Sequence, residues 1–284
     1  MLSLTTIECY RRSQQYPWQE ADGKTPLRDD LIQELRKKWG GGRWIGEGAL
    51  DSASPEHGRI ERKLINQALK KTVSKIIFCD RRKSQIGEII RPLYKWMTGI
   101  DLRGILDLLY NKNLQRGIPT EKALFMAYWR KPSPVPANID PDKDGCGIIW
   151  LAPSVPFEGH HVRAALRIIE QTARLHSFEP NVGLQCVTER SIDMTVAILY
   201  NRDVAGEDER AFACHEQMMQ KLVLEGYIPY RLTTQLMNSQ PPAQDDYGKL
   251  LQQIKKALDP NNILAPGRYD FRSDWAKSEE LTRV

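Results

Sequence analysis

Residues 146–203 read CGIIWLAPSVPFEGHHVRAALRIIEQTARLHSFEPNVGLQCVTERSIDMTVAILYNRD, and this stretch decides the fold. Short apolar runs typical of strands stand on both sides of a segment with the 3.6-residue period of a helix. A second amphipathic helix follows and ends at Gly226. The predicted strands span 146–153, 182–189 and 193–203, and the predicted helices span 160–178 and 207–227.

The order of these elements, strand, helix, strand, strand and helix, lacks the regular βαβ alternation of a parallel sheet. It predicts an α+β fold, an antiparallel sheet flanked by helices. Upstream, apolar residues at helical spacing predict a helix that ends at the glycines 40–42. The apolar residues are Leu27, Leu31, Ile32, Leu35 and Trp39. Further expected elements are a helix at 59–73, a buried strand at 75–80, helices at 87–99 and 103–114, and a turn at 140–145. Pro92 is expected to kink or interrupt the helix at 87–99.

The composition is that of an ordinary soluble protein, with 41% hydrophobic and 27% charged residues among 284. Lysine and arginine outnumber aspartate and glutamate by 41 to 36, and the excess is scattered along the chain. A nucleic-acid-binding protein gathers its basic residues on one face, so nucleic acid is not an expected partner. No apolar run approaches the length of a membrane span, so a membrane is not expected either.

The five cysteines stand far apart and form no CxxC pair, which argues against a disulfide framework and against a zinc site. This usage predicts a reducing, cytoplasmic location. The cysteines are Cys9, Cys79, Cys146, Cys186 and Cys214.

The histidines offer two arrangements that resemble sites. His160 and His161 begin a predicted helix, where neighbouring side chains point about 100° apart and are not expected to share one ion. Cys214 and His215 are also neighbours in a predicted helix, and they face apart for the same reason. The sequence therefore predicts neither a metal site nor a catalytic Cys–His dyad.

The stretch GYIPYR, 226–231, places Tyr230 and Arg231 side by side just past a helix end. A tyrosine hydroxyl donates and accepts hydrogen bonds, and arginine remains cationic at any working pH. Such a pair suits a phenol or a carbonyl that loses a proton or gains negative charge. The alternative is an ordinary surface dipeptide.

After a predicted helix at 247–258, the chain reads LDPNNILAPGRYDF from Leu258 to Phe271. Pro260 stops the helix, and Pro266–Gly267 forces a second tight turn directly before Arg268. A stiff loop holds its next side chain in place at little cost in entropy. Arg268 is therefore either a positioned cation or a solvated charge on a turn.

The motifs ALDPNNILAPGRYD and GYIPYR together resemble the C-terminal signature of the flavin-dependent vanillyl-alcohol oxidase/p-cresol methylhydroxylase family. The stretches YPWQEADGKTPL, KWGGGRWIGEGAL, MAYWRKP, DPDKDGCGIIWLAPSVPFEG, FEPNVGLQCVTER and LYNRDVAGEDERA resemble the cap domain of that family. The likeness covers Tyr16 to Asp270 and is strongest toward its 4-cresol dehydrogenase and eugenol hydroxylase branch.

This resemblance implies an FAD-dependent oxidoreductase that oxidises para-substituted phenols at the benzylic carbon. Hydride passes to flavin N5 and a quinone methide forms. It implies that Tyr230 binds the phenolate, that Arg231 lies by the flavin N1/C2 carbonyl region, and that Arg268 belongs to the phenolate site. These three are the expected catalytic residues. Arg231, Asn262 and Arg268 are the expected cofactor-binding residues.

The resemblance also implies two parts, a cap domain at 1–225 and a C-terminal segment of the FAD-binding domain at 226–284. The N-terminal half of that FAD-binding domain, a separate FAD-domain or cytochrome partner, and a second copy of the chain are the expected protein partners. A catalytically incomplete relative that serves as a binding or assembly module is the alternative. An anion- or nucleic-acid-binding domain, suggested only by the net charge of +5, is a weaker one.

Overall fold

The computed structural model describes residues 2–6, 28–38, 42–99, 101–106, 110, 117–179, 181–232 and 246–266. The chain divides into two compact units, Met1–Ile228 and Pro229–Val284. This division lies close to the expected boundary after residue 225. The assignment of the two parts to a cap and to a FAD-binding domain stays a prediction.

The first unit is built on an antiparallel sheet flanked by helices, so the predicted α+β class is confirmed. Five strands of this unit lie in the order β2-β1-β4-β5-β3, and each neighbouring pair is antiparallel. The strands are β1 (Leu2–Thr6), β2 (Trp44–Gly48), β3 (Cys146–Pro156), β4 (Asn181–Cys186) and β5 (Ser191–Asn201).

Both faces of β5 are buried along its second half. Val196 and Ile198 point to one face and Ala197 and Leu199 to the other, and all four side chains are buried. A strand covered on both faces is an unbroken apolar run, which is why VAIL shows no alternation with polar residues. The long β3–β5 ladder is therefore the centre of the hydrophobic core.

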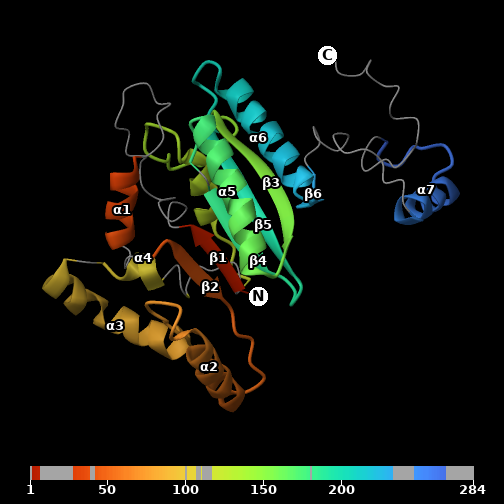
Figure 1. Ribbon diagram of the computed structural model, residues 1–284. Helices are drawn as coiled ribbons and strands as arrows, with labels where there is room; N and C mark the ends of the chain where they lie inside the picture. The colour runs from red at the N-terminus through yellow and green to blue at the C-terminus, as the bar shows by residue number, and fades with distance from the viewer. Residues whose placement is uncertain are drawn as a thin grey trace. The chain divides into compact units, whose positions relative to one another are not determined.

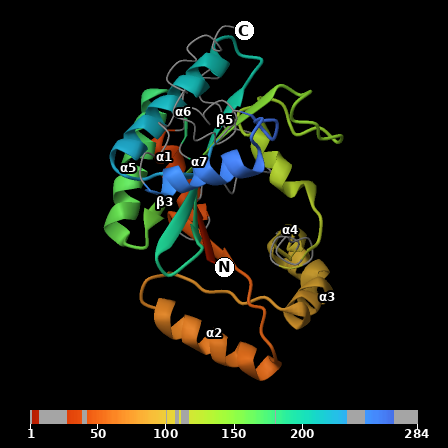
Figure 2. The ribbon, with the colours of Figure 1, turned by 90° about the vertical axis from the view of Figure 1, so that its right-hand side faces the viewer.

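One face of the sheet is covered by α5 (Gly159–Leu175) and α6 (Glu207–Leu224), which lie side by side across the strands (Figure 1, Figure 2). The buried residues of both helices recur at helical spacing, as an amphipathic pattern requires. Gly226 follows α6 with a φ of 82°, a left-handed conformation that glycine adopts without strain and that ends the helix.

The other face of β5 is covered by α1 (Asp29–Lys38) and the 3-10 helix η4 (Glu121–Tyr128). The sequence predicts α1 from its apolar period. One core cluster joins these elements. It consists of Met126, Trp129, Ala197 and Leu199, with Leu31, Ile32 and Ile148 packed against it.

Two adjacent cations are buried where η4 ends. Arg130 donates to the carbonyl oxygen of Ser177 at 2.8 Å and pairs with Glu179 at 3.5 Å. Lys131 donates to Oδ1 of Asn201 at 2.8 Å. A buried charge is costly unless it is paired and hydrogen-bonded, so these contacts fix η4 against the end of β5 and the loop after α5.

Between β2 and η4 the chain forms α2 (Pro55–Leu69), α3 (Arg81–Thr98) and α4 (Arg103–Leu106). Side chains cap two of these helices, because Ser54 accepts from His57 N at 3.2 Å and Asp80 accepts from Lys83 N at 3.0 Å. The interruption expected at Pro92 does not occur, since α3 continues through it. Of the helix expected at 103–114, the described residues form α4, and 107–109 and 111–116 lie outside them.

The strand expected at 75–80 is wrong, because these residues form a loop that leads into the Asp80 cap. A short apolar run becomes a strand only where a neighbouring strand offers hydrogen-bonding partners. Conversely, β1 and β2 were not predicted, although β1 pairs with β2 on one side and β4 on the other. The turn expected at 140–145 is confirmed, with Asp144 N bonded to the carbonyl oxygen of Asp140 at 2.9 Å.

The second unit contains β6 (Pro229–Arg231) and α7 (Asp246–Leu258), the helix expected at 247–258. Leu250, Ile254 and Leu258 form an apolar row along α7, and all three are exposed. No helix in the described part of the chain has both the length and the hydrophobicity needed to cross a membrane.

Gly147 provides a test of the β3–β5 packing. A Cβ at this position would lie 2.3 Å from carbon atoms of the Tyr200 ring on β5, its ladder partner. We expect Gly147→Ala to lower the free energy of unfolding by about 1–3 kcal/mol, the usual cost of overpacking. Chemical denaturation measures it.

Gly159→Ala, in the first turn of α5, is the matched control. The nearest atom there is Nη1 of Arg163 at 3.1 Å, the end of a flexible side chain. Alanine favours the helix, so this variant should be as stable as the wild type or more stable. Equal stability of the two variants would contradict the described packing.

Candidate functional site

The predicted pair Tyr230 and Arg231 lies on β6, at the start of the second unit. Tyr230 is 50% exposed and Arg231 is exposed, whereas Pro229 before them is buried. A hydroxyl and a guanidinium on the same short strand thus remain accessible from solvent. This exposure agrees with both alternatives, an ordinary surface dipeptide and a ligand site.

The loop after α7 is organised by the carboxylate of Asp259, which is 6% exposed. Oδ1 accepts from Ile263 N and Oδ2 accepts from Leu264 N, each at 2.9 Å. Lys255 donates to the same carboxylate and, at 2.7 Å, to the carbonyl oxygen of Leu264. Residues 259–264 therefore form a closed turn, as the prediction of a stiff loop requires.

Asn262 lies within this turn in a left-handed conformation, with a φ of 51°. Its backbone N–H donates to the carbonyl oxygen of Asp259 at 3.0 Å. Its side-chain Oδ1 is buried and has no hydrogen-bond partner among the described residues. A buried acceptor in a folded protein is normally hydrogen-bonded, so this oxygen calls for a donor, which water or a ligand can supply. Arg268, the last predicted site residue, lies outside the described residues.

The three predicted site residues that the structure describes thus lie in two segments of the second unit. Tyr230 and Arg231 lie on β6, and Asn262 lies in the loop after α7, with residues 233–245 outside the described part of the chain between them. Sequence reasoning missed Asp259 as the centre of the loop. The signal was present, since an aspartate followed by Pro-Asn-Asn is typical of a turn in which the carboxylate caps later N–H groups.

Hydrogen bonding holds the Asp259 carboxylate in its charged form. The hydrogen bond from Lys255 lowers the pKa of Asp259, and the bonds from Ile263 and Leu264 act in the same direction against the effect of burial. The loop preceding Arg268 is therefore stabilised by an ionised carboxylate at neutral pH.

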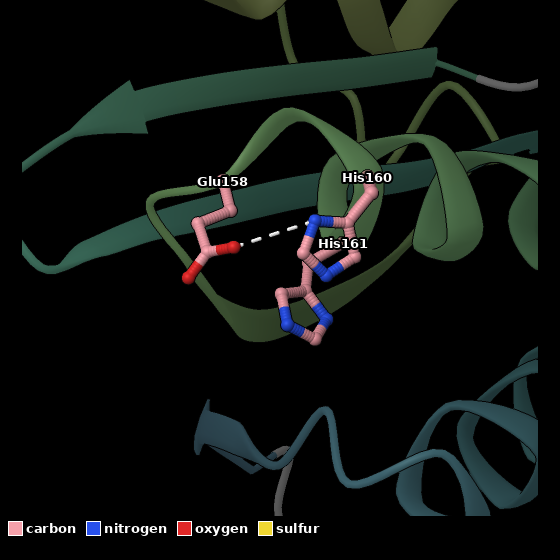
Figure 3. Close-up of side chains that lie close together, drawn as sticks. All are labelled: Glu158, His160 and His161. Atoms are coloured by element: carbon pink, nitrogen blue, oxygen red, sulfur yellow. Dashed lines mark ion pairs between the residues drawn. The ribbon is translucent and has the colours of Figure 1, made fainter.

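In the first unit, the turn between β3 and α5 gathers Glu158, His160 and His161 (Figure 3). Oε2 of Glu158 and Nδ1 of His160 are 3.4 Å apart, and the two imidazole ring centroids are 4.0 Å apart. Helical spacing predicted that the two histidines point apart, and this premise is wrong. Their rings lie together in the first turn of α5, where the His160 side chain is exposed and the His161 side chain is half-buried.

The buried thiols and the buried histidine form no nucleophilic site. Burial raises the pKa of Cys146 to about 11 and that of Cys214 to about 12, so both remain protonated at neutral pH. His215 bonds the carbonyl oxygen of Trp150 at 3.2 Å, and Cys214 donates to the carbonyl oxygen of Thr172. The two neighbours have separate partners, as expected.

Comparison with known proteins finds a fold shared with phenol-oxidising flavoproteins. The crystal structure of p-cresol methylhydroxylase with substrate bound superposes with a TM-score of 0.68 at 20% identity, covering 94% of this chain and 46% of that chain. The isoeugenol complex of 4-ethylphenol oxidase from Gulosibacter chungangensis gives a TM-score of 0.69 at 15% identity, covering 95% and 47%. The fold is that of p-cresol methylhydroxylase-type oxidases.

Sequence comparison extends this relation to two curated proteins. The 1'-carboxy-chondrochloren decarboxylase of Chondromyces crocatus is 44% identical over 265 residues, which are 93% of this chain and 49% of the relative. The flavoprotein subunit of 4-cresol dehydrogenase [hydroxylating] from Pseudomonas putida is 27% identical over 264 residues, 89% of this chain and 42% of the relative. Comparison with protein-family models finds no match.

These relations confirm the resemblance that the motifs carry, to a C-terminal segment of the vanillyl-alcohol oxidase/p-cresol methylhydroxylase family. It spans about half the length of the curated relatives it matches, 49% and 42%.

The lowered pKa of Asp259 predicts that the stability of the loop at 259–264 depends on pH. Its pKa is lowered in the folded state, so its stabilisation is fully present above the ordinary aspartate value of about 3.9 and is lost as the pH falls through the lowered pKa. At neutral pH, Asp259→Asn should speed hydrogen exchange at the amides of Ile263 and Leu264 by roughly tenfold, because hydrogen bonds to a charged group are lost.

The matched control is Asp246→Asn, which removes an exposed ion pair between Asp246 and Lys249 at 3.2 Å within α7. Exposed pairs contribute little, so exchange at Ile263 and Leu264 should not change. Unchanged exchange in Asp259→Asn would contradict the role assigned to this carboxylate.

Proposed function

We propose that the chain forms the phenol-binding side of an FAD-dependent oxidoreductase that oxidises para-substituted phenols at the benzylic carbon. The observation that carries this proposal is the 27% identity to a 4-cresol dehydrogenase flavoprotein subunit over 89% of the chain. The shared fold and the accessible Tyr–Arg pair on β6 support it. The remaining part of the FAD site comes from the other half of the family's length, in the same polypeptide or in a partner.

The residues of the second unit suit an anionic ring system. Tyr230 donates a hydrogen bond to the phenolate oxygen, and Arg231 supplies a fixed cation. Arg268, four residues along the sequence from the loop that Asp259 closes, stabilises the phenolate. Each such charge-assisted contact contributes roughly 1–3 kcal/mol. A phenolate loses hydride from its benzylic carbon more readily than a phenol, because the oxygen electron pair conjugates with the developing positive charge.

The side chains present also fit a flavin. The orphaned buried Oδ1 of Asn262 accepts a hydrogen bond from an N–H group, and Arg231 offers a cation for an electron-rich carbonyl edge. Asn262, Arg231 and Arg268 are therefore the residues that would hold the cofactor. FAD, when bound, would supply a two-electron acceptor for the hydride. The protein residues hold and orient the phenolate and stabilise its charge.

The 44% identity to a decarboxylase favours a second candidate, oxidative decarboxylation of a phenol that carries a carboxylate on its side chain. Removal of hydride from the benzylic carbon of a phenolate leaves a neutral quinone methide. If the adjacent carbon bears a carboxylate, its C–C bond breaks, CO₂ leaves, and the electron pair forms a side-chain double bond and restores the phenolate. The balance is one hydride transferred and one CO₂ released.

The two candidates differ in their products. With a 4-alkylphenol, the first predicts an alcohol or an alkene and no CO₂. With a 3-(4-hydroxyphenyl)propanoate-type substrate, the second predicts one CO₂ and one vinylphenol for each hydride accepted. Product analysis by mass spectrometry with a carboxyl-¹³C label separates them. Turnover of the acid with full retention of the label would remove the second candidate.

Variants test the assigned roles in an assembly that retains flavin. Tyr230→Phe and Arg268→Ala should each lower kcat/KM for the phenol by about tenfold or more, because a phenolate contact is lost, and should lower flavin content less than they lower phenol oxidation. Stopped-flow reduction and flavin absorbance measure the two quantities.

Tyr247→Phe is the control, since this tyrosine is 64% exposed at the start of α7. It should leave both quantities unchanged. An equal loss of phenol oxidation and of flavin in the Tyr230 and Arg268 variants, or no loss at all, would count against phenolate binding.

A further inference from the structure

The turn between β3 and α5 carries three metal-ligating side chains that the proposed oxidation does not use. Glu158, His160 and His161 each offer one ligand atom, and these atoms all lie within 4.8 Å of one another. Figure 3 shows the Glu158 carboxylate and the His160 ring facing each other, with the His161 ring beside them. We name this group the turn cluster.

We propose that the turn cluster binds Zn²⁺. Zinc takes histidine nitrogen and carboxylate oxygen at about 2.0–2.2 Å, so tetrahedral ligand atoms stand about 3.4 Å apart. The oxygen of Glu158 and Nδ1 of His160 are already 3.4 Å apart. Glu158 and His160 are exposed and His161 is half-buried, so rotation about their side-chain bonds closes the remaining separations without moving the backbone. A water molecule completes the four ligands.

The donor set determines the kind of ion. Two imidazoles with one carboxylate suit zinc and its transition-metal neighbours, whereas Mg²⁺ and Ca²⁺ prefer sites made of oxygen ligands. A helix N-terminus disfavours a cation, but this effect is weak at an exposed position and falls off within one turn. The Glu158 carboxylate, directly before α5, offsets it.

Tyr227 orients one of the ligands. Its hydroxyl lies 3.1 Å from Nδ1 of His161, and the two rings meet edge to face with centroids 5.8 Å apart. Tyr227 is 5% exposed, so its ring is held in place by the surrounding packing. With Nδ1 of His161 engaged in this way, the other ring nitrogen is available to the ion, an arrangement usual for ligating histidines.

Zinc bound here joins the β3–α5 turn to the residue that follows α6. Tyr227 comes directly after Gly226, the glycine that ends α6, and His161 lies in the first turn of α5. The ion would thus fix the ends of the two helices that cover one face of the sheet. We expect it to raise the thermal stability of the chain in proportion to its binding.

Zinc titration of the chain after EDTA treatment tests the proposal, with isothermal calorimetry and competition against a chromophoric chelator as readouts. The wild type should bind one equivalent in the micromolar range, and excess Mg²⁺ should not displace it. Glu158→Gln, His160→Asn and His161→Asn should each weaken binding by about 10–100-fold. Tyr227→Phe should weaken it less, because it removes an orienting contact and no ligand.

His57→Asn is the matched control, because His57 and Glu61 form a histidine–carboxylate pair at 3.9 Å that no third ligand joins among the residues the structure describes. This variant should bind zinc as the wild type does. Circular dichroism confirms that each variant is folded. The proposal is overturned if the wild type binds no zinc at millimolar concentration, if the three ligand variants bind as tightly as the wild type, or if His57→Asn abolishes binding.

Discussion

The β3–β5 ladder is the constraint on which the rest of the first unit depends. Residues 146–151 and 154–156 of β3 pair with β5, and β5 is buried on both faces from Val196 onward. α5 and α6 on one face, and α1 with η4 on the other, exclude water from this pair of strands. The burial of its apolar side chains stabilises the folded state, because exposing them to water is unfavourable. Because both strands are long, their ends fix the positions of chain segments that are far apart in sequence.

Polar side chains lie at both ends of the β3–β5 ladder. At one end, the buried Lys131 donates to Asn201 and pairs with Asp203, and the loss of these partners would leave a buried charge uncompensated. At the other end, β3 leads directly into Glu158 and the histidines of the turn cluster. In the described part of the second unit, the carboxylate of Asp259 closes the loop in which Asn262 lies.

The sequence predicted the central strands and helices because each has a strong local signal, such as the continuous apolar run of β5 or the helical period of α5 and α6. It could not predict β1 and β2, since a five-residue strand is defined by a partner remote in sequence rather than by its own pattern. The false strand at 75–80 is the converse case, an apolar run that found no partner.

For the candidate site, the sequence motifs gave Tyr230, Arg231 and Asn262, and local turn chemistry gave a stiff loop. It missed Tyr227, whose burial and contact with His161 depend on how α5 and α6 pack. The sequence analysis also rejected the histidine pair on ideal helical geometry, but side-chain rotation brings the two rings to a centroid distance of 4.0 Å.

The central claim is that this chain forms the phenol side of a flavin site, and anaerobic reduction tests it most directly. The chain, alone or joined with the FAD-binding half of the family, is mixed with FAD, purified and exposed to 4-cresol or to a carboxylated 4-alkylphenol without oxygen. The account predicts a retained flavin spectrum that at least one of these phenols bleaches. Flavin that is never retained, or that neither phenol reduces, would contradict it.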